Sequence, residues 1–117
     1  MKTVELWHNP RCSKSRQTLA LLEENGATVT PFRYLDEAID AKRLTQVLGW
    51  LSMEPRDLIR KKDKLYKELS LENEALSKEE LIAGMLANPK LIERPIAIID
   101  EKAALGRPPE NVLELIK

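Results

Sequence analysis

The stretch TVELWHNPRCSKSRQTLALLEEN, residues 3–25, determines how the rest of the chain is interpreted. Its first part, Thr3–Trp7, alternates in polarity as a strand does, and its last part, from about Ser13, combines helix-forming residues with an apolar face. Between them, the segment His8–Arg16 holds the only cysteine and the only histidine of the sequence. Cys12 is therefore predicted to lie in a turn that leads from a strand into a helix.

This predicted position suits a reactive thiolate. The first amides of a helix lack intrahelical partners and stabilise negative charge at its N-terminus. An ordinary cysteine is about 3% ionised at pH 7, and lowering its pKa by two units costs about 2.7 kcal/mol. A helix end alone contributes about 0.3 to 1 kcal/mol. Neighbouring groups must therefore supply the rest, and the candidates are Arg11, Lys14, Arg16 and His8.

Two nearby side chains are candidates for tuning the thiol. The Ser15 hydroxyl, one helical turn after Cys12, is able to donate a hydrogen bond to the sulfur. His8 either titrates near neutrality and tunes the thiol, or only satisfies a backbone group. For Cys12 itself the alternative is a small, buried and unreactive side chain. We favour the reactive thiolate because charged residues flank Cys12.

Composition limits the classes of protein. The sequence has 117 residues, 43% of them hydrophobic, which is enough for one compact core, so we predict a single domain. Nineteen basic and nineteen acidic side chains cancel, which argues against a nucleic-acid or membrane partner. One cysteine makes no internal disulfide, and no apolar run has the length of a signal peptide or a membrane span. We expect a cytoplasmic protein that acts as a monomer, with no bound cofactor and no metal.

The order of the predicted elements indicates an α/β fold. The strand Thr3–Trp7, the helix from Ser13 and a second strand, Val29–Leu35, form a βαβ unit with parallel strands, and Pro31 places the second strand at an edge. A strand at Pro95–Ile99, a hairpin partner and a final helix follow near the C-terminus. This order, βαβ and then ββα, is that of a thioredoxin-like mixed four-stranded sheet.

The middle of the chain, from about residue 40 to 90, is predicted to be a helical insertion between these halves. Helices are expected at Asp40–Leu51, from Pro55 to the basic cluster Arg60–Lys62, and at Leu65–Leu69. Ser77 with Glu80 forms a capping box that opens one more helix, which ends before Pro89. The whole chain, residues 1–117, is thus predicted to be one thioredoxin-like domain with a helical insertion.

Three arginines lie where predicted elements end: Arg60, Arg94 before Pro95, and Arg107 between a glycine and a proline. A guanidinium keeps its charge and binds tetrahedral oxyanions with two donors. A thiolate that attacks an oxyanion meets a repulsion of about 4 kcal/mol at 4 Å and an effective dielectric of 20. Two or three converging arginines offset this repulsion, so the pattern indicates an oxyanion substrate.

Taken together, these motifs resemble the glutaredoxin-linked arsenate reductases over nearly the whole chain. The matching motifs are His8-Asn9-Pro10-x-Cys12-x-x-Ser15-Arg16, Arg60, Glu93-Arg94-Pro95-Ile96 and Gly106-Arg107-Pro108. The resemblance implies a thioredoxin-like fold with a cis Pro95, Cys12 as the nucleophile, His8 and Ser15 as groups that assist the thiolate, and Arg60, Arg94 and Arg107 as oxyanion ligands. Arsenate reductases of the low-molecular-weight phosphatase type need an arginine six residues after the cysteine, where this chain has Thr18.

The resemblance also implies a mechanism. The Cys12 thiolate attacks arsenate, glutathione acts as co-substrate, and glutaredoxin resolves the intermediate so that arsenite leaves. The lack of a second cysteine fits an external resolving thiol. Two alternatives stay open: a general glutathione-dependent thiol oxidoreductase, and a non-enzymatic regulator of similar fold that binds RNA polymerase. Ser15 stands where the second cysteine of a C-x-x-C redox switch would be, which argues against a redox-switched regulator.

Overall fold

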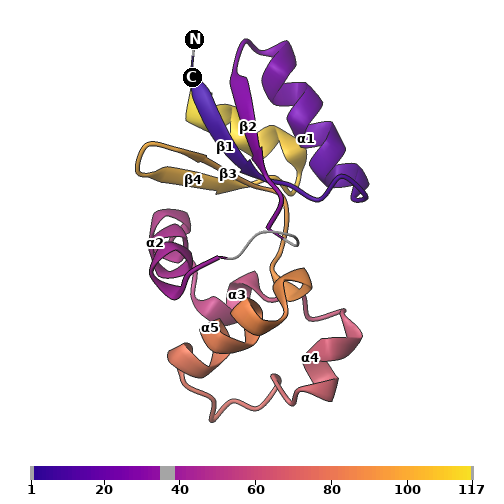
Figure 1. Ribbon diagram of the computed structural model, residues 1–117, viewed down its shortest axis with the longest axis vertical. Coiled ribbons are helices and arrows are strands. Elements are labelled where there is room, and N and C mark those ends of the chain that lie inside the picture. The colour runs from indigo at the N-terminus through magenta and orange to yellow at the C-terminus, as the bar shows by residue number, and fades with distance from the viewer. Residues whose placement is uncertain (1, 35–38, 117) are drawn as a thin grey trace. The chain divides into compact units, whose positions relative to one another are not determined.

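The computed structural model describes residues 2–34 and 39–116 (Figure 1). The chain forms two compact units, one of Met1–Glu37 with Arg94–Lys117 and the other of Ala38–Glu93. No helix among the described residues is long and apolar enough to cross a membrane.

The first unit contains the predicted mixed four-stranded sheet, which is confirmed. Its strands are β1 (Thr3–Trp7), β2 (Thr28–Phe32), β3 (Ile96–Ile99) and β4 (Lys102–Leu105), in the order β2-β1-β3-β4. Strands β1 and β2 are parallel, whereas β3 runs antiparallel to both β1 and β4. Strand β2 lies at an edge, which accommodates the missing amide of Pro31.

Two helices complete the first unit: α1 (Ser13–Glu24) and η2 (Pro109–Ile116). Helix η2 is the yellow helix in Figure 1. Gly26 follows α1 with a φ of +86°, the left-handed conformation that ends a helix at little cost for glycine. The helix predicted near the C-terminus is present as η2, a 3-10 helix. Buried residues of β1, β3, both helices and the position just before β2 share one core: Val4, Leu6, Leu22, Ala27, Ala97 and Val112.

The second unit is the helical segment. It contains α2 (Ala41–Leu51), α3 (Pro55–Leu58), α4 (Lys64–Glu68), α5 (Lys78–Ala87) and the short 3-10 helix η1 (Pro89–Leu91). The predicted capping box is present, because Ser77 accepts from the Glu80 amide and Glu80 accepts from the Ser77 amide.

Two predicted boundaries are wrong, and backbone pairing explains both. Helix α3 ends at Leu58 instead of running into the basic cluster, because Ile59 forms a β-bridge with Ile92 and the Arg60 amide donates to the Leu91 carbonyl at 2.6 Å. Strand β2 ends at Phe32 because the Tyr34 amide donates back to the Phe32 carbonyl at 3.0 Å. The last residue of that predicted strand, Leu35, lies outside the described residues.

Candidate active site

Cys12 occupies the N-cap of α1, at the end of a loop closed by short hydrogen bonds. Its amide donates to the Asn9 carbonyl at 2.9 Å, and its carbonyl accepts from the Arg16 amide at 3.1 Å. The Arg16 side chain donates to the Pro10 carbonyl at 2.8 Å. The loop is therefore held at both of its ends, and the cysteine is fixed at the helix N-terminus, as the sequence predicts.

The environment of the Cys12 sulfur favours the thiolate. The side chain is partly exposed. Burial opposes ionisation, but the backbone amide of Ser15, the Arg94 side chain and the amide of Lys14 outweigh it, so the pKa of Cys12 falls to about 7. A thiol with this pKa is about half ionised at neutral pH. The sulfur is therefore both accessible and nucleophilic.

Arg94 and Arg107 are joined through the backbone. Arg107 Nε donates to the Arg94 carbonyl at 2.7 Å, and the Gly106 amide donates to the Pro95 carbonyl at 2.8 Å. The peptide bond before Pro95 is cis, as expected, and the bond between Arg107 and Pro108 is also cis. The structure thus brings together Cys12, Arg94 and the loop that carries Arg107.

Gly106 has no room for a side chain. A Cβ atom there would lie 2.7 Å from Pro95 Cγ and 2.9 Å from the Oγ1 of Thr18, the buried residue of α1 that donates to the Lys14 carbonyl. Only glycine lets the backbone before Arg107 approach both groups this closely.

Ser15 and His8 both lie close to Cys12 in the chain, and their assignment as groups that assist the thiolate stays a prediction. The Ser15 side chain is fully buried, and its hydroxyl accepts from the Asn9 amide at 3.3 Å, while its own backbone amide faces the sulfur. His8 is 7% exposed, and burial together with Arg33 and Arg16 lowers its pKa. The lowered pKa favours the neutral imidazole.

Arg60 belongs to the second unit. It follows Ile59 in the turn after α3 and is half-buried, and its amide is held by the Leu91 carbonyl. Its assignment as an oxyanion ligand stays a prediction.

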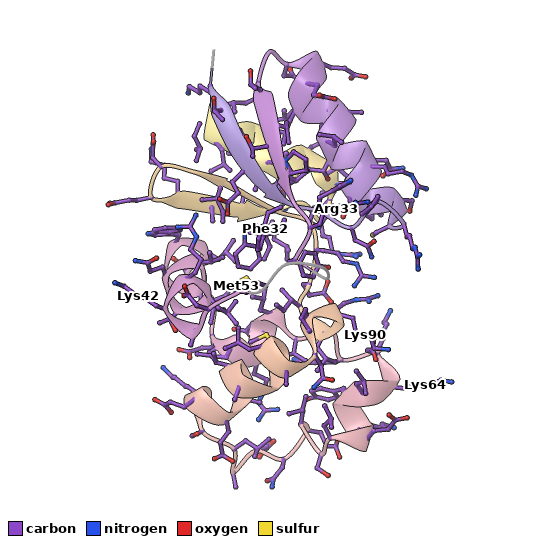
Figure 2. The ribbon with its side chains drawn as sticks, in the orientation of Figure 1. Phe32, Arg33, Lys42, Met53, Lys64 and Lys90 are labelled. Atoms are coloured by element: carbon purple, nitrogen blue, oxygen red, sulfur yellow. The ribbon has the colours of Figure 1, made fainter. Side chains whose placement is uncertain are left out.

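Tyr34 is a residue that the sequence interpretation missed. It follows Phe32 and Arg33, which Figure 2 labels where β2 ends. Its side chain is buried, its ring stacks on that of Trp7, and its charge interaction raises the pKa of Arg94 against the effect of burial. The sequence did hold one signal for Tyr34. Strands β1 and β2 are parallel, so the residues that follow each strand lie at the same end of the sheet. Tyr34 was hidden because the strand pattern was extended to Leu35.

These features define a class of protein, a thioredoxin-like domain with a single cysteine at a helix N-terminus and an arginine against its sulfur. The chain belongs to the ArsC family, whose model matches residues 7–115.

Named relatives cover almost the whole chain. An uncharacterized protein of Escherichia coli (strain K12), YfgD, is 52% identical over 98% of both chains. An arsenate reductase of Haemophilus influenzae is 44% identical over 97% of this chain and 99% of its own. The solved structure of an arsenate reductase from Vibrio cholerae has a TM-score of 0.94 and 46% identity, with 97% of each chain covered.

Proposed function

We propose that this protein is an arsenate reductase in which the Cys12 thiolate attacks arsenate. The observation that carries the proposal is the sulfur itself, whose pKa is lowered to about 7 by two helix amides and the guanidinium of Arg94. The arsenate reductases among its relatives, such as that of Haemophilus influenzae at 44% identity, support the choice of substrate.

The proposed first step forms a sulfur–arsenic bond and releases one arsenate oxygen as water. Arg94, hydrogen-bonded to the sulfur, partly neutralises both the nucleophile and the incoming anion. Arg107, tied to the backbone of Arg94, is proposed as a second ligand of the oxyanion, and Arg60 as a third. The uncharged His8 is suited to accept or relay a proton, since it holds no charge that would compete for the anion.

The second half of the reaction needs thiols from outside the chain. Reduction of As(V) to As(III) takes two electrons, which the oxidation of two thiols to a disulfide supplies, so that arsenate and two thiols yield arsenite, a disulfide and water. The sequence holds one cysteine, and we propose glutathione as the co-substrate and glutaredoxin as the partner that resolves the intermediate.

The test is a coupled assay that follows NADPH oxidation through glutathione reductase, with and without arsenate. The wild-type rate is expected to depend on arsenate, glutathione and glutaredoxin together, and Cys12→Ser should reduce it to the background without enzyme. A wild-type rate that does not change on adding arsenate contradicts the proposal.

A disulfide substrate in the same assay distinguishes an arsenate reductase from a general thiol oxidoreductase. That reaction needs no oxyanion ligand, so Arg107→Ala should leave it intact while arsenate reduction falls. Equal loss in both reactions would contradict the assignment of Arg107 to the oxyanion.

A further inference from the structure

Asn9 closes the turn that leads to Cys12 with two hydrogen bonds. Its carbonyl accepts from the Cys12 amide at 2.9 Å, and its side-chain Oδ1 accepts from the Arg11 amide at 3.0 Å. Asparagine at the first position and proline at the second, here Pro10, are typical of a β-turn, and a side chain that accepts from the amide two residues on adds an Asx turn to it. Asn9 is only 8% exposed, so it is enclosed by the fold and not free in solvent.

The same turn is attached to helix α1. The Asn9 amide donates to the buried Ser15 hydroxyl at 3.3 Å, and the Arg16 amide donates to the Cys12 carbonyl at 3.1 Å. Cys12 is thereby the N-cap of α1, where the first helical amides have no partner within the helix and stabilise negative charge. The position of the sulfur relative to these amides therefore depends on the turn that precedes it.

We infer that Asn9 is a positioning residue: its Oδ1, by holding the Arg11 amide, keeps the turn closed and the Cys12 sulfur at the first amides of α1. Without this acceptor the Arg11 amide loses a hydrogen bond and the turn gains backbone freedom. The sulfur then spends less time at the amides that stabilise its thiolate. The inference rests on the proposed function only in taking Cys12 as the reacting group, and the reactivity of the sulfur is measurable without arsenate.

The test is the pH profile of Cys12 alkylation by iodoacetamide in Asn9→Ala, which removes the Oδ1 acceptor and keeps the backbone groups of the turn. We expect the midpoint of the profile to rise by about half a unit. The rate at pH 6 then falls about threefold, because the thiolate fraction below the pKa falls tenfold for each unit by which the pKa rises. A profile that coincides with the wild type overturns the inference, whether or not the protein reduces arsenate.

Asn73→Ala is the matched control, because Asn73 closes the same kind of turn in the second unit. Its carbonyl accepts from the Leu76 amide at 3.3 Å, and its Oδ1 accepts from the Ala75 amide at 2.9 Å. Leu76 thus stands where Cys12 stands in the first turn. This variant is expected to keep the wild-type profile. Equal shifts in Asn9→Ala and Asn73→Ala would indicate a general effect of loosening a turn and would overturn the inference.

Asn9→Ser tests whether the hydrogen-bond acceptor is the feature that matters. A serine hydroxyl is able to accept from the same backbone amide, but more weakly than an asparagine side chain. The rate at pH 6 is therefore expected to fall by only about 1.5-fold, less than in Asn9→Ala. A fall as large as that of Asn9→Ala would mean that the acceptor does not hold the sulfur in place, and would overturn the role assigned to Asn9.

Discussion

Arg94 and Arg56 use the same side chain for different purposes. Each is influenced by a tyrosine: Tyr34 raises the pKa of Arg94, and the hydroxyl of Tyr66 accepts from Arg56 at 3.2 Å. The other partners of Arg56 are backbone carbonyls, of Leu71 at 2.7 Å and of Asn73 at 2.9 Å. Arg94 instead contacts the thiol of Cys12. The second partner decides whether the arginine stabilises the fold or tunes a reactive group.

The physical reason is that a carbonyl has one charge state, whereas a thiol has two. The hydrogen bonds of Arg56 join α3 to the loop after α4, and they contribute to the free energy of unfolding. Arg94 interacts more strongly with the thiolate than with the thiol, so its contribution appears as a shift in the Cys12 pKa. Substituting each arginine should therefore change a different measurement.

The largest effect is expected for Arg94→Ala. Loss of its hydrogen bond and its charge should raise the pKa of Cys12 by about 1 unit or more, which slows alkylation at pH 6 about tenfold. Arsenate reduction should fall about 100-fold or more, because the guanidinium also faces the developing charge. Alkylation profiles and the coupled assay measure the two effects, with Arg56→Ala as the control. If Arg94→Ala and Arg56→Ala shift the pH profile of Cys12 alkylation equally, the two arginines do not have the different roles assigned to them.

A second, smaller effect is expected for Arg56→Ala, and on stability. Removing three hydrogen bonds from a charged donor should lower the free energy of unfolding by about 2 kcal/mol, which a urea transition measures. Lys64→Ala is the control, because Lys64 is exposed at the start of α4 (Figure 2) and should change stability by less than about 0.5 kcal/mol. An unchanged urea midpoint in Arg56→Ala would show that these hydrogen bonds contribute little.

Much of the fold could be predicted because its pattern is local. The alternation in Thr3–Trp7 and the capping box at Ser77 each specify an element by themselves, and the structure contains both. The errors at α3 and β2 have a different origin. Both ends are determined by hydrogen bonds between backbone groups, and for α3 the partner lies about thirty residues along the chain. Such pairing leaves no periodic signal in the sequence.

The site could be predicted only in part, for a related reason. Arg94 was singled out because it precedes a proline at a predicted strand. Nothing in that pattern shows that it contacts the sulfur while Arg56, which follows a proline, binds carbonyls. The charge state of His8 is equally hidden, because burial and the distances to Arg33 and Arg16 determine its pKa. Side-chain contacts across the fold decide these roles.

The smallest effect is expected for Ser15→Ala, and it separates backbone from side chain at the sulfur. The substitution keeps the Ser15 amide, which faces Cys12, and removes the hydroxyl, which accepts from the buried Asn9. The Cys12 pKa should therefore move by less than about 0.3 unit, while the free energy of unfolding falls by about 1 kcal/mol. Ser13→Ala, at an exposed position of the same helix turn, is the control. If the Cys12 pKa instead rises by a full unit in Ser15→Ala, the Ser15 hydroxyl donates to the thiolate. Arg94 and the helix amides would then not be sufficient to stabilise the Cys12 thiolate.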